Sequence, residues 1–290
     1  MKVARSIEEL AAFRAEVPAL HRVGFVPTMG ALHAGHVSLV ELAQSLAETV
    51  VVSIFVNPLQ FGPGEDYARY PRPLEVDLER CAALGVDLVF VPPVTDLYPP
   101  GRQVSVSAGN MGTVLEGLSR PGHFDGVLTV VLKLLHLVRP QLVVFGRKDA
   151  QQLAAVRRMV RDLNVDVRVV GAPTVREPDG LALSSRNVFL SPAERALGLS
   201  LCTALGRATA ASSLGEAVAA AQEVLHQADQ DPAFSLDYLA AVNPASFAPV
   251  TDGTEADVLL AVAAVVGGTR LIDNVELSFA PAEPADAGPA

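Results

Sequence analysis

The sequence lacks the features that mark secreted, membrane-spanning or nucleic-acid-binding proteins. Its two cysteines, Cys81 and Cys202, form no C-x-x-C pair and therefore indicate neither a disulfide framework nor a zinc ribbon. There is no signal-peptide pattern, and apolar runs such as 258–266 are too short to span a bilayer. Basic runs are also missing, and 22 Lys and Arg against 32 Asp and Glu give a formal net charge of −10. We therefore expect a cytoplasmic protein with no membrane or nucleic-acid partner.

Hydrophobic residues, by contrast, are plentiful, and their spacing predicts an α/β fold. They make up 50% of the 290 residues, enough to bury a sizeable core in one large or two modest domains. Short apolar runs alternate with amphipathic helical patterns, which is typical of a parallel, Rossmann-like doubly wound sheet. Ligands of such sheets gather at the carboxyl ends of the strands. The expected strands are 23–26, 49–56, 86–91, 141–145 and 167–170, with a further possible strand at 104–107.

The pattern changes after Pro173. A turn at 177–180 is followed by two Ala-rich helices, 192–211 and 215–228, and then by three extended segments. This order of elements predicts a second, smaller α+β domain that serves as a lid. The final residues are mostly Ala, Pro, Glu and Asp, a composition typical of disorder. The predicted divisions are a larger domain at 1–174, the smaller C-terminal domain at 175–279 and a disordered tail at 280–290.

Residues 26–36 are the most informative stretch. A short apolar run precedes them and an amphipathic run follows, so they form a strand–turn–helix junction. Such a junction directs the free N–H groups of a helix start, and its positive dipole end, toward a bound anion. Gly30 and Gly35 have the spacing of a P-loop, but His36 stands where that loop needs Lys. The imidazoles of His33 and His36 would instead offer donors suited to a leaving phosphate in the transition state.

Besides phosphate contact, the histidine pair has two possible roles. Histidines three residues apart are often only structural, satisfied by nearby hydrogen bonds. A metal site is the second possibility, but no Cys or carboxylate lies nearby at zinc-ligand spacing. Because a Gly-punctuated turn after a strand is where α/β proteins bind ligands, phosphate contact is favoured.

A family resemblance rests on the string Pro27-Thr28-Met29-Gly30-Ala31-Leu32-His33-x-Gly35-His36. It resembles the HxGH signature of the nucleotidylyltransferase superfamily and, within it, the longer motif of the pantoate–β-alanine ligase family. The resemblance runs from residue 1 to about 278 through five motifs in the expected order. It implies ATP-dependent condensation of pantoate with β-alanine to pantothenate through pantoyl adenylate, with release of AMP and pyrophosphate. It also implies that residues 1–174 bind ATP and pantoate, and that the protein is a homodimer.

Two further motifs match the family's ATP site. In Gly146-Arg147-Lys148-Asp149, Lys148 is placed to contact phosphates, and Asp149 to accept from ribose hydroxyls while capping a helix. Leu183-Ser184-Ser185-Arg186-Asn187 offers hydroxyls and a guanidinium that suit a triphosphate. The chain departs from the family at Arg147, where Glu is usual, and at Ala150, where Tyr is common. The implied ATP-binding residues are Met29, Gly30, His33, His36, Gly146, Lys148, Asp149, Val175, Leu183, Ser184, Ser185 and Arg186, of which His36, His33 and Lys148 are the implied catalytic residues.

Neutral amides are expected to hold pantoate. Gln60 and Gln152 match family positions that bind this substrate, and a buried amide without another partner would cost free energy. The string at 119–126 also matches the family, and it is expected to hold the second substrate or to close the site. The residues implied for pantoate and β-alanine are Pro27, Thr28, Met29, Asn57, Gln60, Arg120, His123 and Gln152.

Magnesium is the cofactor that the resemblance implies beside ATP. The family places its ligands near 75–80, where Val76 and Arg80 are poor ligands and Asp77 remains as the candidate. Because magnesium usually keeps its waters and binds mainly through nucleotide phosphates, one outer carboxylate would suffice.

Other functions fit these residues less well. Another HxGH-type nucleotidylyltransferase acting on a phosphate ester is the main alternative, but its substrate would favour Arg or Lys in place of Gln60 and Gln152. A silent nucleotide-binding regulator would not need the His pair with Lys148 and Arg186. An aminoacyl-tRNA synthetase is disfavoured by the acidic composition. Since the sequence suggests no Cys–His or Ser–His nucleophile, the expected catalysis is in-line positioning and charge stabilisation.

Overall fold

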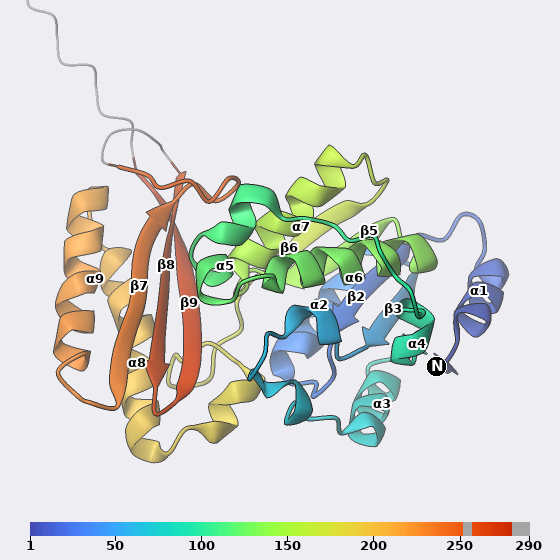
Figure 1. The fold of residues 1–290 in the computed structure, drawn as a ribbon, viewed down its shortest axis with the longest axis horizontal. Helices are drawn as coiled ribbons and strands as arrows, with labels where there is room; N and C mark the ends of the chain where they lie inside the picture. The colour runs from blue at the N-terminus through green and yellow to red at the C-terminus, as the bar shows by residue number, and fades with distance from the viewer. Residues whose placement is uncertain (252–256, 280–290) are drawn as a thin grey trace, which may run out of the picture. The chain divides into compact units, whose positions relative to one another are not determined.

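A computed structural model describes residues 1–251 and 257–279, so the expected tail at 280–290 lies outside the described residues. The chain forms two compact units (Figure 1). Each unit has its own buried hydrophobic core. The first unit comprises Met1–Arg176 and Leu183–Ser185. The second comprises Glu177–Ala182 and the chain from Arg186 onward.

The first unit is built on a six-stranded parallel sheet in the order β1-β4-β3-β2-β5-β6. From β2 the chain adds β3 and β4 on one side, and later β5 and β6 on the other, so the direction of winding reverses between β2 and β5. The predicted Rossmann-like doubly wound sheet is therefore confirmed. The strands are β1 (Lys2–Ala4), β2 (Val23–Thr28), β3 (Thr49–Ile54), β4 (Leu88–Phe90), β5 (Leu142–Gly146) and β6 (Arg168–Ala172).

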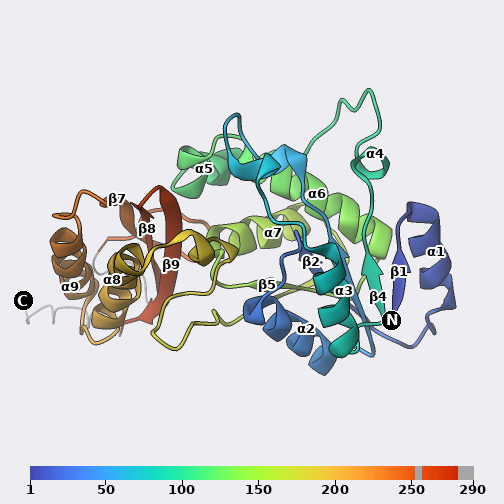
Figure 2. The same ribbon diagram turned by 90° about the horizontal axis from the view of Figure 1, so that it is seen from below.

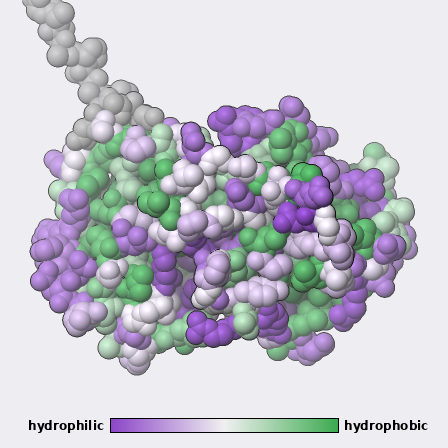
Figure 3. Space-filling view, in the orientation of Figure 1, coloured by the Kyte–Doolittle hydropathy of each residue, from purple (hydrophilic) through white to green (hydrophobic). Residues whose placement is uncertain are grey.

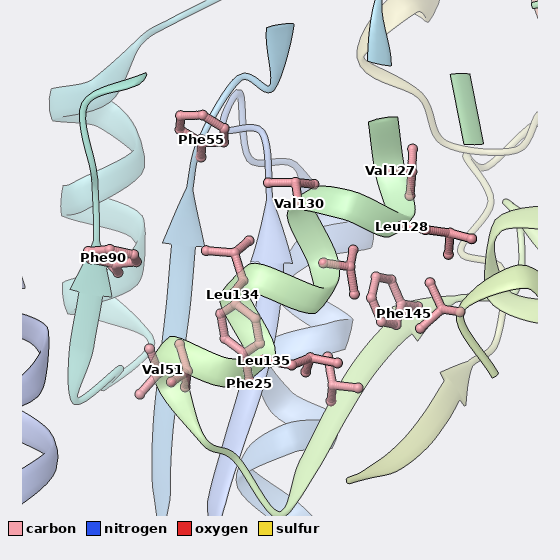
Figure 4. Close-up of a cluster of buried hydrophobic side chains, with 14 of the residues drawn as sticks. Phe25, Val51, Phe55, Phe90, Val127, Leu128, Val130, Leu134, Leu135 and Phe145 are labelled. Carbon is pink, nitrogen blue, oxygen red and sulfur yellow. The ribbon is translucent and has the colours of Figure 1, made fainter. Parts of the chain in front are cut away.

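Helices cover both faces of this sheet. Alternate residues of a strand point to opposite faces. Phe25 and Val51 accordingly lie in the core beneath α6 (Figure 4), and Val26 and Val52 in the core beneath α2. Figure 2 shows α2 and α3 on one side of the sheet and α6 on the other. The helices of the first unit are α1 (Ile7–Glu16), α2 (Ala34–Leu46), α3 (Leu74–Ala83), α4 (Val94–Leu97), α5 (Glu116–Ser119), α6 (His123–Val138) and α7 (Ala150–Asp162), with short 3-10 turns η1 (Pro58–Gln60), η2 (Asp66–Ala68) and η3 (Gly109–Thr113).

Two strands differ from the expected set. The sequence pattern did not predict β1, because three residues carry too little periodicity to be recognised, although β1 pairs with β4 along its whole length. The possible strand at 104–107 was wrong, since that segment forms no strand. There the N–H of Val106 donates to the hydroxyl of Thr129 at 3.0 Å, so it takes a side-chain acceptor in place of a neighbouring strand.

The second unit confirms the smaller α+β fold. Its antiparallel sheet has the order β7-β8-β9, and β8 is buried along nearly its whole length. Leu201, Leu225 and Leu260 pack in its core, which joins two helices to the sheet. The elements are η4 (Ser185–Phe189), whose first residue belongs to the first unit, α8 (Pro192–Ala208), α9 (Leu214–Ala228), β7 (Phe234–Val242), β8 (Asp257–Val266) and β9 (Thr269–Ser278).

Hydrophilic and hydrophobic residues are interspersed over the face of the molecule drawn in Figure 3. Within residues 1–251 and 257–279, no helix has both the length and the apolar character needed to cross a membrane.

Candidate active site

The signature motif and the Lys148 motif follow adjacent strands. β2 ends at Thr28 and β5 at Gly146, and the two strands pair in parallel, so their carboxyl ends lie at the same edge of the sheet. This is where the winding reverses, the usual ligand crevice of a doubly wound sheet. Burial is the main cause that lowers the pKa of His36, and the positive charge of Lys148 also contributes. The structure thus places the predicted catalytic residues His33, His36 and Lys148 at the same edge of the sheet.

Backbone N–H groups along the signature loop, residues 29–36, bond to the protein itself. The sequence predicted free N–H groups in this loop. That prediction was wrong for the five N–H groups that are listed with their acceptors at the end of this paragraph. Gly30 and Ala31 have positive φ angles of 83° and 51°, and such a turn presents successive N–H groups to one acceptor. The five N–H groups given below are therefore bonded within the protein and are not free donors for a phosphate. The bonds are Gly30 N to Thr28 Oγ1 (3.1 Å), Ala31 N to Asp77 Oδ2 (2.7 Å), Leu32 N to Asp77 Oδ1 (2.8 Å), His33 N to His36 Nδ1 (3.3 Å) and Gly35 N to His33 Nδ1 (3.1 Å).

The two imidazoles of the loop have the same tautomer. Since Nδ1 of His33 accepts from Gly35 and Nδ1 of His36 accepts from His33, each ring carries its proton on Nε2. Burial, followed by electrostatic interaction with His33, Lys148 and Arg80, lowers the pKa of His36 to about 3. The ring centroids are 4.2 Å apart. In this hydrogen-bonded arrangement the pair presents two Nε2–H donors. Arg80, a poor metal ligand, instead contributes positive charge to this site.

Gln60 lies in η1, where only 9% of the residue is exposed, and both its side chain and its backbone are hydrogen-bonded. Its side-chain oxygen accepts from Asn57 Nδ2 at 3.0 Å, and its Nε2 donates to the sulfur of Met29 at 3.0 Å. Its backbone carbonyl accepts from His123 Nδ1 at 2.8 Å and from Arg120 Nη2 at 3.2 Å. Five of the residues predicted to contact pantoate or β-alanine thus form one bonded cluster, and they orient one amide.

Asn57 connects η1 to α6. Its Nδ2 also donates to the carbonyl of Gly126 at 3.1 Å, while its oxygen accepts from the hydroxyl of Tyr98 at 2.7 Å. Burial raises the pKa of Tyr98, which keeps the hydroxyl protonated as a donor. Gly126 allows this close approach, because a Cβ there would overlap the carbonyl of Leu59. Asn57 has a clear positioning role, and its predicted contact with pantoate stays a prediction.

His123 and Arg120 face each other and an unexpected partner, Glu65. Because Nδ1 of His123 donates to the Gln60 carbonyl, its Nε2 accepts from Arg120 Nη1 at 3.1 Å. Burial, followed by the charge of Arg120, lowers the pKa of His123 to about 4. Arg120 forks onto Glu65 at 3.1 and 2.6 Å, and this bonding lowers the pKa of Glu65. A substrate carboxylate at Arg120 would have to share or replace this pairing.

The adjacent glutamines of α7 have different roles. Gln151 is buried and bonds three backbone groups: its Nε2 donates to Met111 O at 2.8 Å and Val114 O at 2.9 Å, and its oxygen accepts from Glu116 N at 3.1 Å. Gln152 is half-buried on the same helix. Only Gln152 was predicted to bind pantoate, and the hydrogen bonds of Gln151 explain why its neighbour is the better candidate.

Asp149 occupies the N-cap position of α7, but its side chain makes no cap hydrogen bond and is exposed. The expected capping role was therefore wrong, while the expected contact with ribose stays a prediction. In the second ATP motif, Leu183 N donates to Val175 O at 3.0 Å. Ser184 and Ser185 belong to the first unit, and the chain enters the second unit at Arg186.

The residues near Asp77 do not fit a magnesium ion held by the protein. Both carboxylate oxygens accept backbone N–H groups, and the residue is 1% exposed. Its helix neighbours Val76 and Arg80 supply no oxygen ligand. In the described part of the chain, no three His, Cys, Asp or Glu side chains are grouped so that they could hold a metal.

The lowered pKa values of His36 and His123 should make the stability of the fold depend on pH. We expect the free energy of unfolding to decrease between pH 7 and pH 5, because the unfolded chain binds protons on these two residues near pH 6.5 whereas the folded chain does not. The stabilisation is present above pH 6.5 and is lost as the pH falls toward the folded pKa values. Each histidine should contribute about 1–2 kcal/mol over this range. Urea unfolding at the two pH values measures the change.

The control for this prediction is His36→Asn, which removes one of the two titrating groups. Its free energy of unfolding should depend on pH about half as steeply as that of the parent. A parent protein whose stability is the same at both pH values would contradict the prediction.

Comparisons with known proteins identify the family of the chain. A family model described as pantoate-beta-alanine ligase matches residues 2–276. A pantothenate synthetase of Thermobifida fusca is 57% identical over 286 residues, covering 96% of each chain. The crystal structure of pantothenate synthetase from Thermus thermophilus superposes with a TM-score of 0.88 at 49% identity, over 95% of this chain and 99% of that one. A ligase from Francisella tularensis, complexed with "Beta-gamma ATP and Beta-alanine", has a TM-score of 0.78 at 36% identity, over 95% and 97%.

Proposed function

We propose a mechanism from the premise that the chain belongs to the pantoate-beta-alanine ligase family. The protein is an ATP-dependent ligase that joins pantoate to β-alanine. The observation that carries the mechanism is the pair of neutral imidazoles with Nε2–H donors, with the charge of Lys148 nearby, at the carboxyl ends of β2 and β5. The match over residues 2–276 favours this ligase over a nucleotidylyltransferase that acts on a phosphate ester.

In the first step, a carboxylate oxygen of pantoate attacks the α-phosphorus of ATP. The bond from that phosphorus to the bridging oxygen breaks, and pyrophosphate leaves. His33, His36 and Lys148 stabilise the charge that develops on the phosphate oxygens. Ser184, Ser185 and Arg186 bind the remaining phosphates, and Asp149 binds the ribose. The other residues proposed to line the ATP site are Met29, Gly30, Gly146, Val175 and Leu183.

In the second step, the amine of β-alanine attacks the acyl carbon of pantoyl adenylate. The acyl–oxygen bond breaks, AMP leaves, and the nitrogen loses a proton. Gln60 and Gln152 hold the hydroxyls of pantoate, so its carboxylate stays free to react. Arg120 and His123 orient Gln60, and Arg120 receives the carboxylate of β-alanine when Glu65 moves aside. Pro27, Thr28 and Asn57 complete this proposed pocket.

Magnesium would be supplied with ATP and would screen the charge of the phosphates, with no ligand from Asp77. We further propose a homodimer in the cytoplasm, and a domain boundary near residue 174 with the smaller domain as a lid. The chain passes from the first unit to the second between Ser185 and Arg186, within the motif that matches the family's ATP site, and this supports the lid. Sedimentation equilibrium tests the dimer.

Isotope exchange tests the order of steps. We expect labelled pyrophosphate to exchange into ATP when pantoate is present without β-alanine, because the adenylate forms and reverts in the absence of the amine. The rate should depend on pantoate and vanish without it. Exchange that strictly required β-alanine would contradict a separate adenylate step, and product formation without AMP release would contradict the whole proposal.

A further inference from the structure

Asp77 has an environment unlike that of a surface metal ligand. It lies in the first half of α3, where the helix dipole favours a carboxylate, and only 1% of the residue is exposed. Oδ2 accepts from Ala31 N at 2.7 Å and Oδ1 from Leu32 N at 2.8 Å. One carboxylate therefore bonds two successive residues of the signature loop, 45 and 46 positions earlier in the chain.

The backbone that Asp77 bonds is strained. Ala31 has a φ angle of 51°, a left-handed conformation that costs free energy for any residue with a Cβ. Such conformations persist only where the surroundings impose them. Two short hydrogen bonds to a buried charge are strong enough to do so. The same turn forms a concave pair of N–H groups that would suit an external anion, and Asp77 fills it.

This bond pair acts directly on the histidines. Leu32 immediately precedes His33, which begins α2 by accepting from Gly35 at its Nδ1. The N–H of His33 in turn fixes the ring of His36. If Ala31 relaxed to a negative φ angle, the path of the chain into His33 would change, and both Nε2–H donors would move with it.

We propose that Asp77 is the positioning residue of the signature loop, and that it acts through its two hydrogen bonds and not as a magnesium ligand. The inference rests on the proposed function for its effect on catalysis, but the bonds themselves are independent of that function. Asp77 fixes the turn at Gly30 and Ala31, and it thereby orients the Nε2–H groups of the two imidazoles toward the phosphates of ATP.

The substitution Asp77→Asn distinguishes a positioning role of Asp77 from a role as a magnesium ligand. The amide keeps nearly the same shape, but it can accept from only one of the two N–H groups and turns its own NH₂ toward the other. We expect ATP affinity and kcat/KM to fall roughly ten- to a hundredfold. Removing a negative charge near a polyanion would by itself tighten ATP binding, so the sign of the change is informative.

Calorimetry with ATP, in EDTA and at increasing magnesium, gives the decisive comparison. Loop positioning predicts that the loss of affinity is present without magnesium and is not reversed by excess magnesium. A loss confined to the magnesium titration, and reduced at high magnesium, would overturn the proposal in favour of a metal ligand. Unchanged or tighter ATP binding in EDTA would also overturn it.

A matched control is Asp87→Asn. The carboxylate of Asp87 accepts from the N–H of Val50 at 2.7 Å near the start of β3, away from the carboxyl ends of the strands. Its replacement should leave ATP affinity unchanged. Asp77→Glu is a second variant, which keeps the charge but displaces the oxygens by one methylene, and positioning predicts that its loss of ATP affinity is also present in EDTA.

Amide hydrogen exchange tests the bonds without reference to activity. We expect the N–H groups of Ala31 and Leu32 to exchange slowly in the parent protein and about tenfold or more faster in Asp77→Asn, while Val50 stays unchanged. Fast exchange of both groups in the parent would overturn the proposal even if the variant failed to fold. Absence of ligase activity in the parent would instead overturn the proposed function and leave this result standing.

Discussion

Replacing His36 by Ala should lower turnover by about 10²–10³-fold, the typical effect of removing one preorganised donor from a developing oxyanion. The ring accepts from the N–H of His33 at Nδ1, so its single proton is on Nε2 and serves as a donor. ATP affinity should fall less than turnover, because the phosphate gains charge on these oxygens only in the transition state. Steady-state kinetics and calorimetry measure the two quantities separately.

A histidine outside the site provides the control. His21 is exposed, and His21→Ala should leave turnover unchanged. Since the pKa of His36 is about 3, turnover should show no titration of this residue above about pH 5. Equal losses of turnover and ATP affinity in His36→Ala would mean that the residue binds ground state and transition state alike. A titration near neutral pH that disappears in the variant would contradict its assignment as a neutral donor.

Replacing Gln60 or Gln152 by Leu should raise the KM for pantoate about ten- to a hundredfold, with little change in ATP affinity. The nucleophile of the first step is a carboxylate, whose lone pairs must stay available. Neutral amides can hydrogen-bond the hydroxyls of pantoate without stabilising the negative charge of its carboxylate. A bidentate Arg would instead bind the carboxylate itself. A lost hydrogen bond in a desolvated pocket costs roughly 1–3 kcal/mol, which gives the expected range.

Gln152→Leu is the cleaner of these two variants. Gln60 also bonds Asn57 and Met29, so its replacement disturbs its neighbours as well as the substrate. Gln151→Leu is the matched control, because it leaves three backbone groups without their partner and should lower stability more than it changes the KM for pantoate. If Gln152→Leu weakened ATP as much as pantoate, measured by calorimetry with ATP alone, the glutamine would belong to the nucleotide site.

Local sequence determined most of the elements and the place of the site. The continuous apolar run of β3 and the helical spacing of α2 identify these elements without reference to the rest of the chain, because each pattern repeats within a few residues. Ser6 caps α1 by accepting from Glu9 N at 3.2 Å, and such a cap can be recognised in the sequence because it involves close neighbours. Alternating strands and helices then restrict the sheet to a doubly wound order, which places both motifs at one edge.

The tertiary structure decided which groups of the site remain available to a substrate. The sequence of the signature loop suggests free N–H groups, yet Ala31 and Leu32 bond to Asp77, which joins them only through the packing of α3. Likewise, Gln60 is oriented by His123, 63 positions away. A carboxylate or imidazole has several possible partners of similar strength, and sequence pattern does not rank them. The fold chooses among them because it fixes which donors and acceptors meet at hydrogen-bond distance and leaves buried groups no water as an alternative.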